Sequence, residues 1–310
     1  MRTNLLRLVL LGCLALLAVL VLVGCSGGRS WGPATGRIAF TSERDENSEI
    51  YVMEADGSGQ TNLTSDPSGD EEPFWSPDGS RLAFSTRRKQ QVDIYTMASD
   101  GSDVQQFTNS PAVKGFLRWS PDGSKVTFYS FEQPDEGYLW VFDLETAEGR
   151  PLLAGIHPAG LEAICAGGFP GNWLPDSETV VFRGYNAESA AAQICSVKAD
   201  GSDLKVLYTE PNTNNVNPSA SRDGKKIVFM SDRDGNNEIY TVDADGSDRR
   251  RLTEDEANDD YPTWSPDGDW IAFASDRDGD FEIYIMRPDG SDLRQLTDNT
   301  FADIQPTWTP

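Results

Sequence analysis

Two short segments carry carboxylates at a spacing that suits a hard cation. In each, two aspartates and a later glutamate flank a glycine, as in Asp-Arg-Asp-Gly-Asn-Asn-Glu. The two sets are Asp232, Asp234 and Glu238, and Asp276, Asp278 and Glu282. Ca²⁺ takes several oxygen ligands, which such a bend can supply. Asp-Gly is equally a common hairpin turn, so Ca²⁺ binding and simple turn formation are the two interpretations of these segments.

Catalytic residues are hard to place in this chain. Its single histidine, His157, is not accompanied by a Gly-x-Ser-x-Gly motif, so a serine hydrolase would need an unfamiliar arrangement. Acidic residues working in pairs, or holding a metal, would suit a lyase-like enzyme, but nothing in the sequence marks one pair as perturbed. We therefore expect binding rather than catalysis.

These residues belong to a repeated unit, which must position them. The motif Trp-Ser-Pro-Asp-Gly is followed by a short apolar run that closes on phenylalanine. The six phenylalanines are Phe40, Phe84, Phe128, Phe182, Phe229 and Phe273. The six motif positions are Trp75, Trp119, Trp173, Ala220, Trp264 and Trp308. The first phenylalanine has no motif before it and the last tryptophan has no phenylalanine after it, which predicts that the two ends complete one unit and close a ring.

Each copy contains four short segments with strand character. In the last copy they are residues 261–264, 270–275, 282–287 and 293–297, rich in β-branched and aromatic types. Ser-Pro-Asp-Gly and Asp-Gly-Ser supply the tight turns between them. The sequence therefore predicts an all-β fold over residues 37–310. That fold is a six-bladed β-propeller of four-stranded antiparallel blades, closed by pairing of the N- and C-terminal strands.

The order of these motifs resembles a known repeat. Pro-x-Trp-Ser-Pro-Asp-Gly, Ile-Ala-Phe-x-Ser-x-Arg-Asp-Gly, Glu-Ile-Tyr and Asp-Gly-Ser with Leu-Thr follow one another in residues 262–297. This order is similar to the PD40 repeat, a WD40-like repeat in the propeller of the TolB family. The resemblance implies a six-bladed propeller and a protein-binding role in the cell envelope. TolB has an additional N-terminal domain, whereas here only about a dozen residues of the expected exported chain, residues 25–36, precede the first blade.

Strand parity predicts which residues share an end of the propeller. The Ser-Pro-Asp-Gly and Asp-Gly-Ser turns fall at one end, so the links between blades fall at the other, beside the channel mouth. That second end is acidic, and we interpret it as the face that binds a partner. The residues assigned to this face are Asp70, Glu71, Glu72, Asp259, Asp260 and Asp303.

The N-terminal residues predict export. A basic head precedes the apolar stretch Leu8–Val23, and the stretch ends at Cys25. This pattern is typical of a signal peptide over residues 1–24, and Cys25 resembles the lipidated cysteine of a bacterial lipoprotein. Residues 25–36 would then form a flexible tether, and the lipid would hold the protein on a membrane at the periplasmic or extracellular side. An uncleaved signal anchor is the alternative.

Two cysteines, Cys165 and Cys195, fall in the propeller, both in its irregular fourth copy. The exported compartment permits a disulfide, but spacing alone does not establish one. A disulfide and a pair of buried free thiols are therefore the two alternatives. The longer spacing of this copy predicts an insertion at the link end, which is either a binding loop or sequence drift stabilised by a disulfide.

The charge balance restricts the partners. The chain carries 50 acidic and 26 basic residues, a net charge of −24. Nucleic acid is excluded, because nothing here could neutralise its phosphates. We expect a monomeric, lipid-anchored propeller that binds a basic protein or peptide partner in the cell envelope. The alternatives are a polysaccharide-active or metal-dependent, lyase-like enzyme acting at the acidic channel mouth, and a sensor of Ca²⁺ or another ligand.

Overall fold

The structure is a computed structural model that describes residues 32–88, 91–109, 113–133, 136–153, 165–186 and 191–310. The predicted signal peptide (1–24), Cys25 and His157 lie outside the described residues, and the tether is described only from Gly32. None of the described residues forms a helix of the length and apolarity needed to cross a bilayer.

The described strands form six four-stranded antiparallel sheets, the blades. Blade 1 contains β24 (Asp303–Trp308), β1 (Arg37–Ser42), β2 (Glu49–Glu54) and β3 (Thr61–Asn62). Blade 2 contains β4 (Asp70–Trp75), β5 (Arg81–Thr86), β6 (Asp93–Ala98) and β7 (Gln105–Gln106). Blade 3 contains β8 (Val113–Trp119), β9 (Lys125–Gln133), β10 (Glu136–Asp143) and β11 (Glu148–Pro151). Blade 4 contains β12 (Ala166–Trp173), β13 (Thr179–Asn186), β14 (Ala191–Lys198) and β15 (Lys205–Tyr208). Blade 5 contains β16 (Asn215–Ala220), β17 (Lys226–Ser231), β18 (Glu238–Asp243) and β19 (Arg250–Arg251). Blade 6 contains β20 (Asp259–Trp264), β21 (Ile271–Ser275), β22 (Glu282–Met286) and β23 (Arg294–Gln295).

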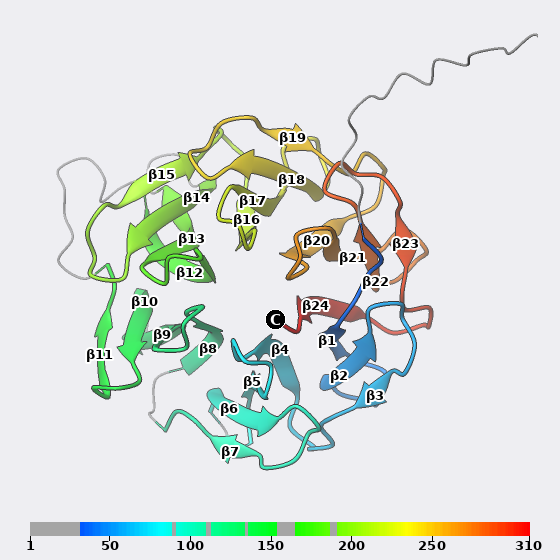
Figure 1. Ribbon diagram of the computed structural model, residues 1–310, viewed down its shortest axis with the longest axis horizontal. Coiled ribbons are helices and arrows are strands. Elements are labelled where there is room, and N and C mark those ends of the chain that lie inside the picture. The colour runs from blue at the N-terminus through cyan, green and yellow to red at the C-terminus, as the bar shows by residue number, and fades with distance from the viewer. Residues whose placement is uncertain (1–31, 89–90, 110–112, 134–135, 154–164, 187–190) are drawn as a thin grey trace, which may run out of the picture. The chain divides into compact units, whose positions relative to one another are not determined.

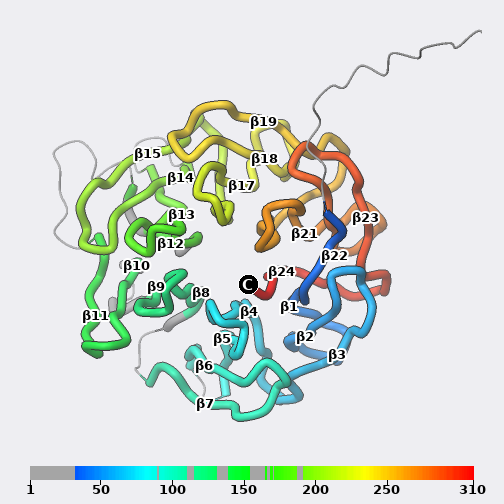
Figure 2. The backbone as a smooth tube through the Cα atoms, in the orientation of Figure 1, coloured from blue at the N-terminus to red at the C-terminus, as the bar shows by residue number. Residues whose placement is uncertain are grey.

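The ring closes through blade 1, which both ends of the chain build. β24 pairs antiparallel with β1, so that Trp308 lies opposite Ile38 and Asp303 opposite Ser42. The red C-terminal strand and the blue N-terminal strand are neighbours in the tube view (Figure 2). The six blades surround a common centre, with the first strand of each repeat innermost (Figure 1). The predicted six-bladed propeller and its closure are therefore confirmed.

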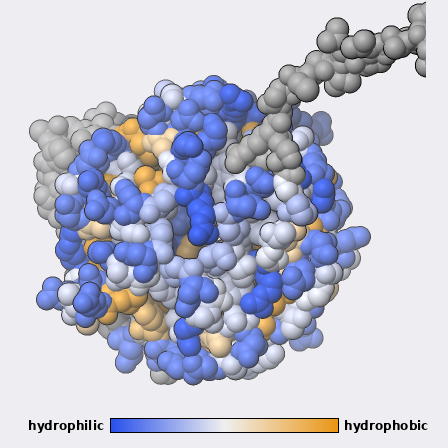
Figure 3. Space-filling view, viewed as in Figure 1, coloured by the Kyte–Doolittle hydropathy of each residue, from blue (hydrophilic) through white to orange (hydrophobic). Residues whose placement is uncertain are grey.

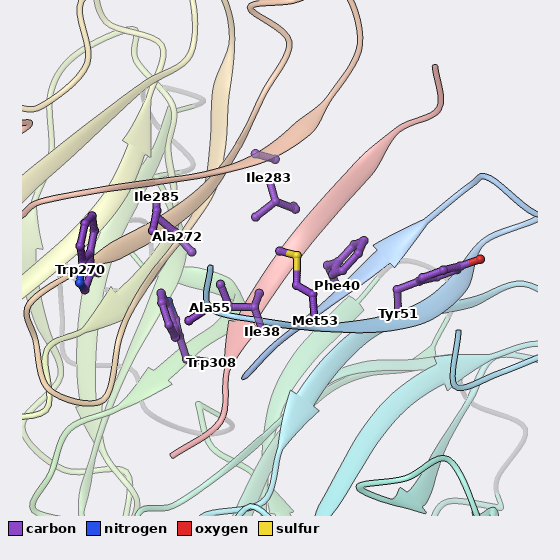
Figure 4. Close-up of a cluster of buried hydrophobic side chains, with 11 residues drawn as sticks. Ile38, Phe40, Tyr51, Met53, Ala55, Trp270, Ala272, Ile283, Ile285 and Trp308 are labelled. Carbon is purple, nitrogen blue, oxygen red and sulfur yellow. The ribbon is translucent and has the colours of Figure 1, made fainter. Parts of the chain in front are cut away.

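The apolar core lies between neighbouring blades. Figure 4 shows one such cluster, in which Ile38 and Met53 of blade 1 face Ile283 and Ile285 of blade 6, with Trp308 beside them. Trp75, Trp173 and Trp264 are buried in the same way at other boundaries, and Trp119 is partly buried. Burial of these side chains joins each blade to the next, because a single blade cannot bury its own apolar faces.

The two ends of the ring differ, as parity predicts. The β1–β2 loop lies against the link into β24, where Glu43 N donates to the carbonyl oxygen of Ala302 at 3.0 Å. At the opposite end the Asp-Gly-Ser turn meets the Ser-Pro-Asp-Gly turn, where Ser99 N donates to Ser80 O at 2.9 Å. We call the first end, with the second-to-third-strand loops and the interblade links, the link face. The second is the turn face.

Candidate functional site

Three of the six residues predicted to bind a partner at the link face are buried and form ion pairs within the protein. Asp70, Asp259 and Asp303 are the first residues of the innermost strands β4, β20 and β24, and each is 0% exposed. Each accepts a hydrogen bond from an arginine of its own blade, in the loop after the second strand. The pairs are Asp70 with Arg88 (2.6 Å), Asp259 with Arg277 (2.8 Å) and Asp303 with Arg44 (2.5 Å). The charge of these three aspartates is therefore neutralised inside the blade.

Burial and the arginines act on these aspartates in opposite directions. Burial raises the pKa of Asp70 and of Asp259, and the neighbouring guanidinium groups only partly offset that rise. The arginines are held in turn by aromatic rings, as Arg277 lies over Tyr284 with 4.8 Å between its Cζ atom and the ring centroid. The arginine of the Ser-x-Arg motif is thus a structural residue of the blade.

The other three predicted residues of this face, Glu71, Glu72 and Asp260, are not paired with these arginines. Glu71 is exposed at the rim, whereas Glu72 and Asp260 line a cavity of about 330 Å³ at the centre of the ring. Phe74, Arg118, Phe169 and Arg183 also line it. We call this space the central cavity.

A bulge in the innermost strands forms the wall of the central cavity. The pairing register shifts in the middle of the strand, for example between Glu71 and Phe74 of β4 and between Asp260 and Thr263 of β20. In five of the six innermost strands, all except β12, one residue other than glycine has a left-handed φ at the bulge. These residues are Glu72 (60°), Phe116 (59°), Asn217 (53°), Tyr261 (53°) and Gln305 (57°). Such a conformation is costly for a side-chain-bearing residue, and a bulge re-aims side chains. Five different side chains are thereby brought to one cavity.

The two cavity carboxylates are oriented by hydrogen bonds. Glu72 Oε2 accepts from Ser85 Oγ at 2.7 Å and from Phe116 N at 2.9 Å. Asp260 Oδ1 accepts from Asn217 Nδ2 and from Tyr261 N, both at 2.7 Å. Burial raises the pKa of both carboxyls.

Two cavity arginines were missed by sequence reasoning. Arg118 of β8 lies over the ring of Phe74 at 4.4 Å, and Arg183 of β13 lies over Phe169 at 4.9 Å. Burial lowers the pKa of Arg118 to about 10 and also lowers that of Arg183. The signal for Arg118 is its position directly before the repeated tryptophan, where other copies carry no charge. Arg183 follows Phe182, the closing phenylalanine of the irregular copy.

The first calcium candidate has its carboxylates bound to protein groups. Glu238 is buried and accepts from Arg251 Nη2 at 2.7 Å and Thr253 Oγ1 at 2.6 Å. Asp232 accepts from the backbone N of Asn214, and Asp234 accepts from the hydroxyl of Tyr240. The three side chains therefore have separate partners.

The second calcium candidate has the same arrangement. Asp276 accepts from Asn258 N at 2.6 Å, Glu282 accepts from Asn299 N at 2.5 Å, and Asp278 accepts from Gln295. Within the described part of the chain, no three His, Cys, Asp or Glu side chains converge as metal ligands. The loops also close as turns, since Gly279 N donates to the carbonyl oxygen of Asp276. Their geometry thus favours the turn interpretation, and the Ca²⁺ interpretation lacks the convergence that it requires.

Blade 4 contains a disulfide between Cys165 and Cys195, and both residues are buried. It joins the segment before β12 to the middle of β14. The predicted insertion before this blade falls on residues 154–164, which lie outside the described residues.

Comparison with known proteins identifies relatives of the fold. The model of the PD40 family, described as the TolB β-propeller domain, matches residues 15–116 and 110–310. TolB from Acinetobacter baumannii is 20% identical, with a TM-score of 0.77 over 90% of this chain and 68% of that one. A putative TolB from Agrobacterium tumefaciens is 22% identical, with a TM-score of 0.68 over 88% and 92% of the two chains. An oligogalacturonate lyase in complex with manganese is 17% identical, with a TM-score of 0.57 over 84% and 73%. These structures share the fold. A search of curated proteins gives no match.

Proposed function

The chain belongs to the PD40 family of TolB β-propeller domains, and we propose that it is a binding scaffold of the cell envelope. In this proposal the protein is exported, carries lipid on Cys25, and binds a basic protein or peptide through the link face without catalysing a reaction. Propellers suit this role because their loops gather at the two ends of a rigid ring.

The observation that carries the proposal is the set of exposed carboxylates on the link face. They are distinct from the aspartates that the arginines neutralise. The exposed acidic residues without such an arginine are Glu43, Asp45, Glu46, Glu71, Glu254, Glu256, Asp278 and Asp298, whereas the exposed Asp255 pairs with Arg277 at 3.1 Å. A field of one sign attracts a partner of the opposite sign and speeds its association. The link into β24 adds Phe301, which is 46% exposed and could serve as an apolar anchor among these charges.

The point at which the chain enters the propeller supports the orientation needed for such binding. Gly32 N donates to Asp269 Oδ2 at 2.7 Å, and Gly32 O accepts from Arg287 Nη1 at 2.7 Å. Both partners belong to loops of the turn face. Gly32 is only seven positions after Cys25, which gives a reach of at most about 25 Å. A lipid on Cys25 would therefore bring the turn face toward the bilayer and leave the link face accessible.

Affinity capture from solubilised membranes tests the proposed face. Glu254→Gln/Glu256→Gln removes two exposed charges from the link face, whereas the control Glu145→Gln/Glu148→Gln removes two from the turn face. We expect the first variant to lose captured protein and to weaken its dependence on salt, since fewer charges then attract the partner. Equal capture by both variants would reject the link face as the binding surface.

The anchor is tested separately by labelling cells with a radioactive fatty acid. We expect the wild-type chain to take up label and to sediment with membranes. Cys25→Ser should abolish both. Label retained by the Cys25→Ser chain would exclude this attachment point, and an unlabelled wild-type chain held in the membrane would favour the signal anchor.

A further inference from the structure

Two half-buried arginines line the central cavity, and neither forms an ion pair among the described residues. Across the described residues, Arg118 makes one side-chain hydrogen bond, from Nη1 to Leu117 O at 2.9 Å, and no ion pair. Arg183 makes neither a side-chain hydrogen bond nor an ion pair there; its partner is the ring of Phe169. Glu72 acts on Arg118 electrostatically, yet most N–H donors of the two arginines have no partner among the described residues, although the chain has 50 acidic residues.

The unused donors of these arginines are open to the cavity. A guanidinium group has five N–H donors in a planar fork that fits a carboxylate. The side-chain nitrogens and oxygens that are both buried and without a partner in the described residues include none from Arg118 or Arg183. The free nitrogens are therefore accessible, and the central cavity is the space that both residues line.

Two carboxylates of the cavity wall present acceptors in the same manner, and one of them, Glu72, accepts from Phe116 N of β8, the strand that also carries Arg118. Glu72 and Asp260 each have one carboxylate oxygen committed to protein donors. The second oxygen of each makes no hydrogen bond within the described chain, and it is not among the buried atoms that lack a partner. One oxygen of each residue therefore remains available to a ligand that lies in the cavity.

The two signs of charge come from different parts of the ring. The arginines belong to blades 3 and 4, whereas Glu72 belongs to blade 2 and Asp260 to blade 6. Two positive and two negative groups give a cavity with no net charge and a strong internal polarity. A ligand with only one charge would be repelled by half of the wall, whereas a neutral ligand with separated charges would satisfy both halves.

Aromatic rings line the space between the charges. Phe116 and Phe169 meet edge to face with 5.5 Å between centroids, and Phe74 and Tyr261 also line the cavity. The cavity volume of about 330 Å³ is at the lower end of the range for small-molecule sites. Its volume and lining therefore fit a compact ligand with an apolar body.

We propose that the central cavity binds a small zwitterion, an α-amino acid with an apolar or aromatic side chain. Arg118 and Arg183 hold its carboxylate, Glu72 and Asp260 accept hydrogen bonds from its ammonium group, and the rings surround its side chain. The residues concerned lie inside the ring, so this site is separate from the rim that the proposed function assigns to a macromolecular partner.

The same chemistry could be presented by a free amino acid or by a residue within a peptide, and blocked probes distinguish these sources. Calorimetric titration of the full-length chain with L-phenylalanine and L-leucine should give saturable binding. N-acetyl-L-phenylalanine lacks the ammonium group and L-phenylalaninamide lacks the carboxylate. We expect each to bind at least tenfold more weakly, because charge-assisted hydrogen bonds are then lost. A peptide with both termini blocked should not bind. Absence of binding by both free amino acids, or equal binding by a blocked probe, would overturn the proposal.

A matched pair of arginine variants tests the residues. Arg118→Gln removes a cavity arginine, whereas Arg37→Gln removes an arginine that lies over Trp75 at 5.1 Å and donates to Ser99 O, outside the cavity. We expect Arg118→Gln to weaken L-phenylalanine binding at least tenfold and Arg37→Gln to leave it within twofold. Equal affinities of the two variants would contradict the assigned role. If Arg118→Gln does not fold, the probe series on the wild-type chain decides.

A variant of the link face tests whether the central cavity is separate from the proposed partner-binding surface. Glu254→Gln/Glu256→Gln should bind L-phenylalanine as the wild type does, even where it captures no membrane protein. If this variant folds correctly but no longer binds the amino acid, the cavity and the link face form a single site, which would contradict the proposal.

Discussion

The replacement Arg277→Met should strongly destabilise the propeller while keeping most of the side-chain volume. Asp259 is 0% exposed, and Arg277 Nη2 lies 2.8 Å from its Oδ1 and 3.0 Å from its Oδ2. The methionine leaves a buried carboxylate without its cation. Breaking a buried pair in this way costs about 3–5 kcal/mol of unfolding free energy. Urea unfolding at pH 7, followed by circular dichroism, measures the difference.

The repeat itself suggests the compensating change. Blade 5 has Asn215 where blade 6 has Asp259, and this asparagine is also 0% exposed, donating to Ala192 O at 3.2 Å. Asp259→Asn should therefore restore part of the stability when it is added to Arg277→Met, because no buried charge then remains. The deficit of Arg277→Met should also shrink as the pH falls and Asp259 takes up a proton, since burial raises the pKa of this carboxyl.

Two results would refute this reasoning. A loss below about 1 kcal/mol in Arg277→Met would mean that the pair behaves as an exposed ion pair does. A double variant no more stable than Arg277→Met would mean that the uncompensated charge is not the cause of the loss. The double-mutant cycle separates these cases, provided that unfolding is two-state.

Three further predictions concern protons, the disulfide and calcium. Burial, together with the charge of Asp303, raises the pKa of Glu282 to about 7 from an ordinary value near 4.5. The wild type should therefore lose stability as the pH rises from 5 to 8, and Glu282→Gln should melt at a higher temperature than the wild type at pH 8, with a smaller gap at pH 5. An unchanged gap would contradict this. Replacing Cys165 and Cys195 by alanine opens a loop of 30 residues and should cost about 3–4 kcal/mol in urea unfolding; a cost near zero would count against a constraining role. Addition of 2 mM Ca²⁺ to chelator-treated protein should leave the melting temperature unchanged, and a rise of several degrees would restore the calcium interpretation.

The fold could be predicted because the same pattern of strands and turns recurs along the sequence. The offset between the phenylalanine series and the tryptophan series gave the ring closure, which the pairing of β24 with β1 confirms. The up-and-down order of the four strands in a blade predicted the two faces, because loops that follow successive antiparallel strands fall at opposite ends. The predominantly hydrophilic surface in Figure 3, with apolar residues in small separate groups, agrees with the acidic composition.

The site could be predicted only in part, because the decisive facts are contacts between distant residues. Asp259 and Asp260 are adjacent in the sequence, yet one is buried against Arg277 and the other lines the central cavity. The bulge causes this difference, and a bulge has no unique sequence signature. Arg118 and Arg183 meet at the cavity only because blades 3 and 4 are neighbours in the ring.

The central claim, that the link face rather than the turn face meets the partner, is tested most directly by photocrosslinking in cells. Phe301 on the link face and Leu293 on the turn face are each 46% exposed, so a photoreactive residue is equally accessible at both. We predict a discrete crosslinked protein from position 301, and none from position 293 beyond the background of the unirradiated sample. Crosslinking from position 293 alone, or equally from both positions, would contradict the assignment of the link face.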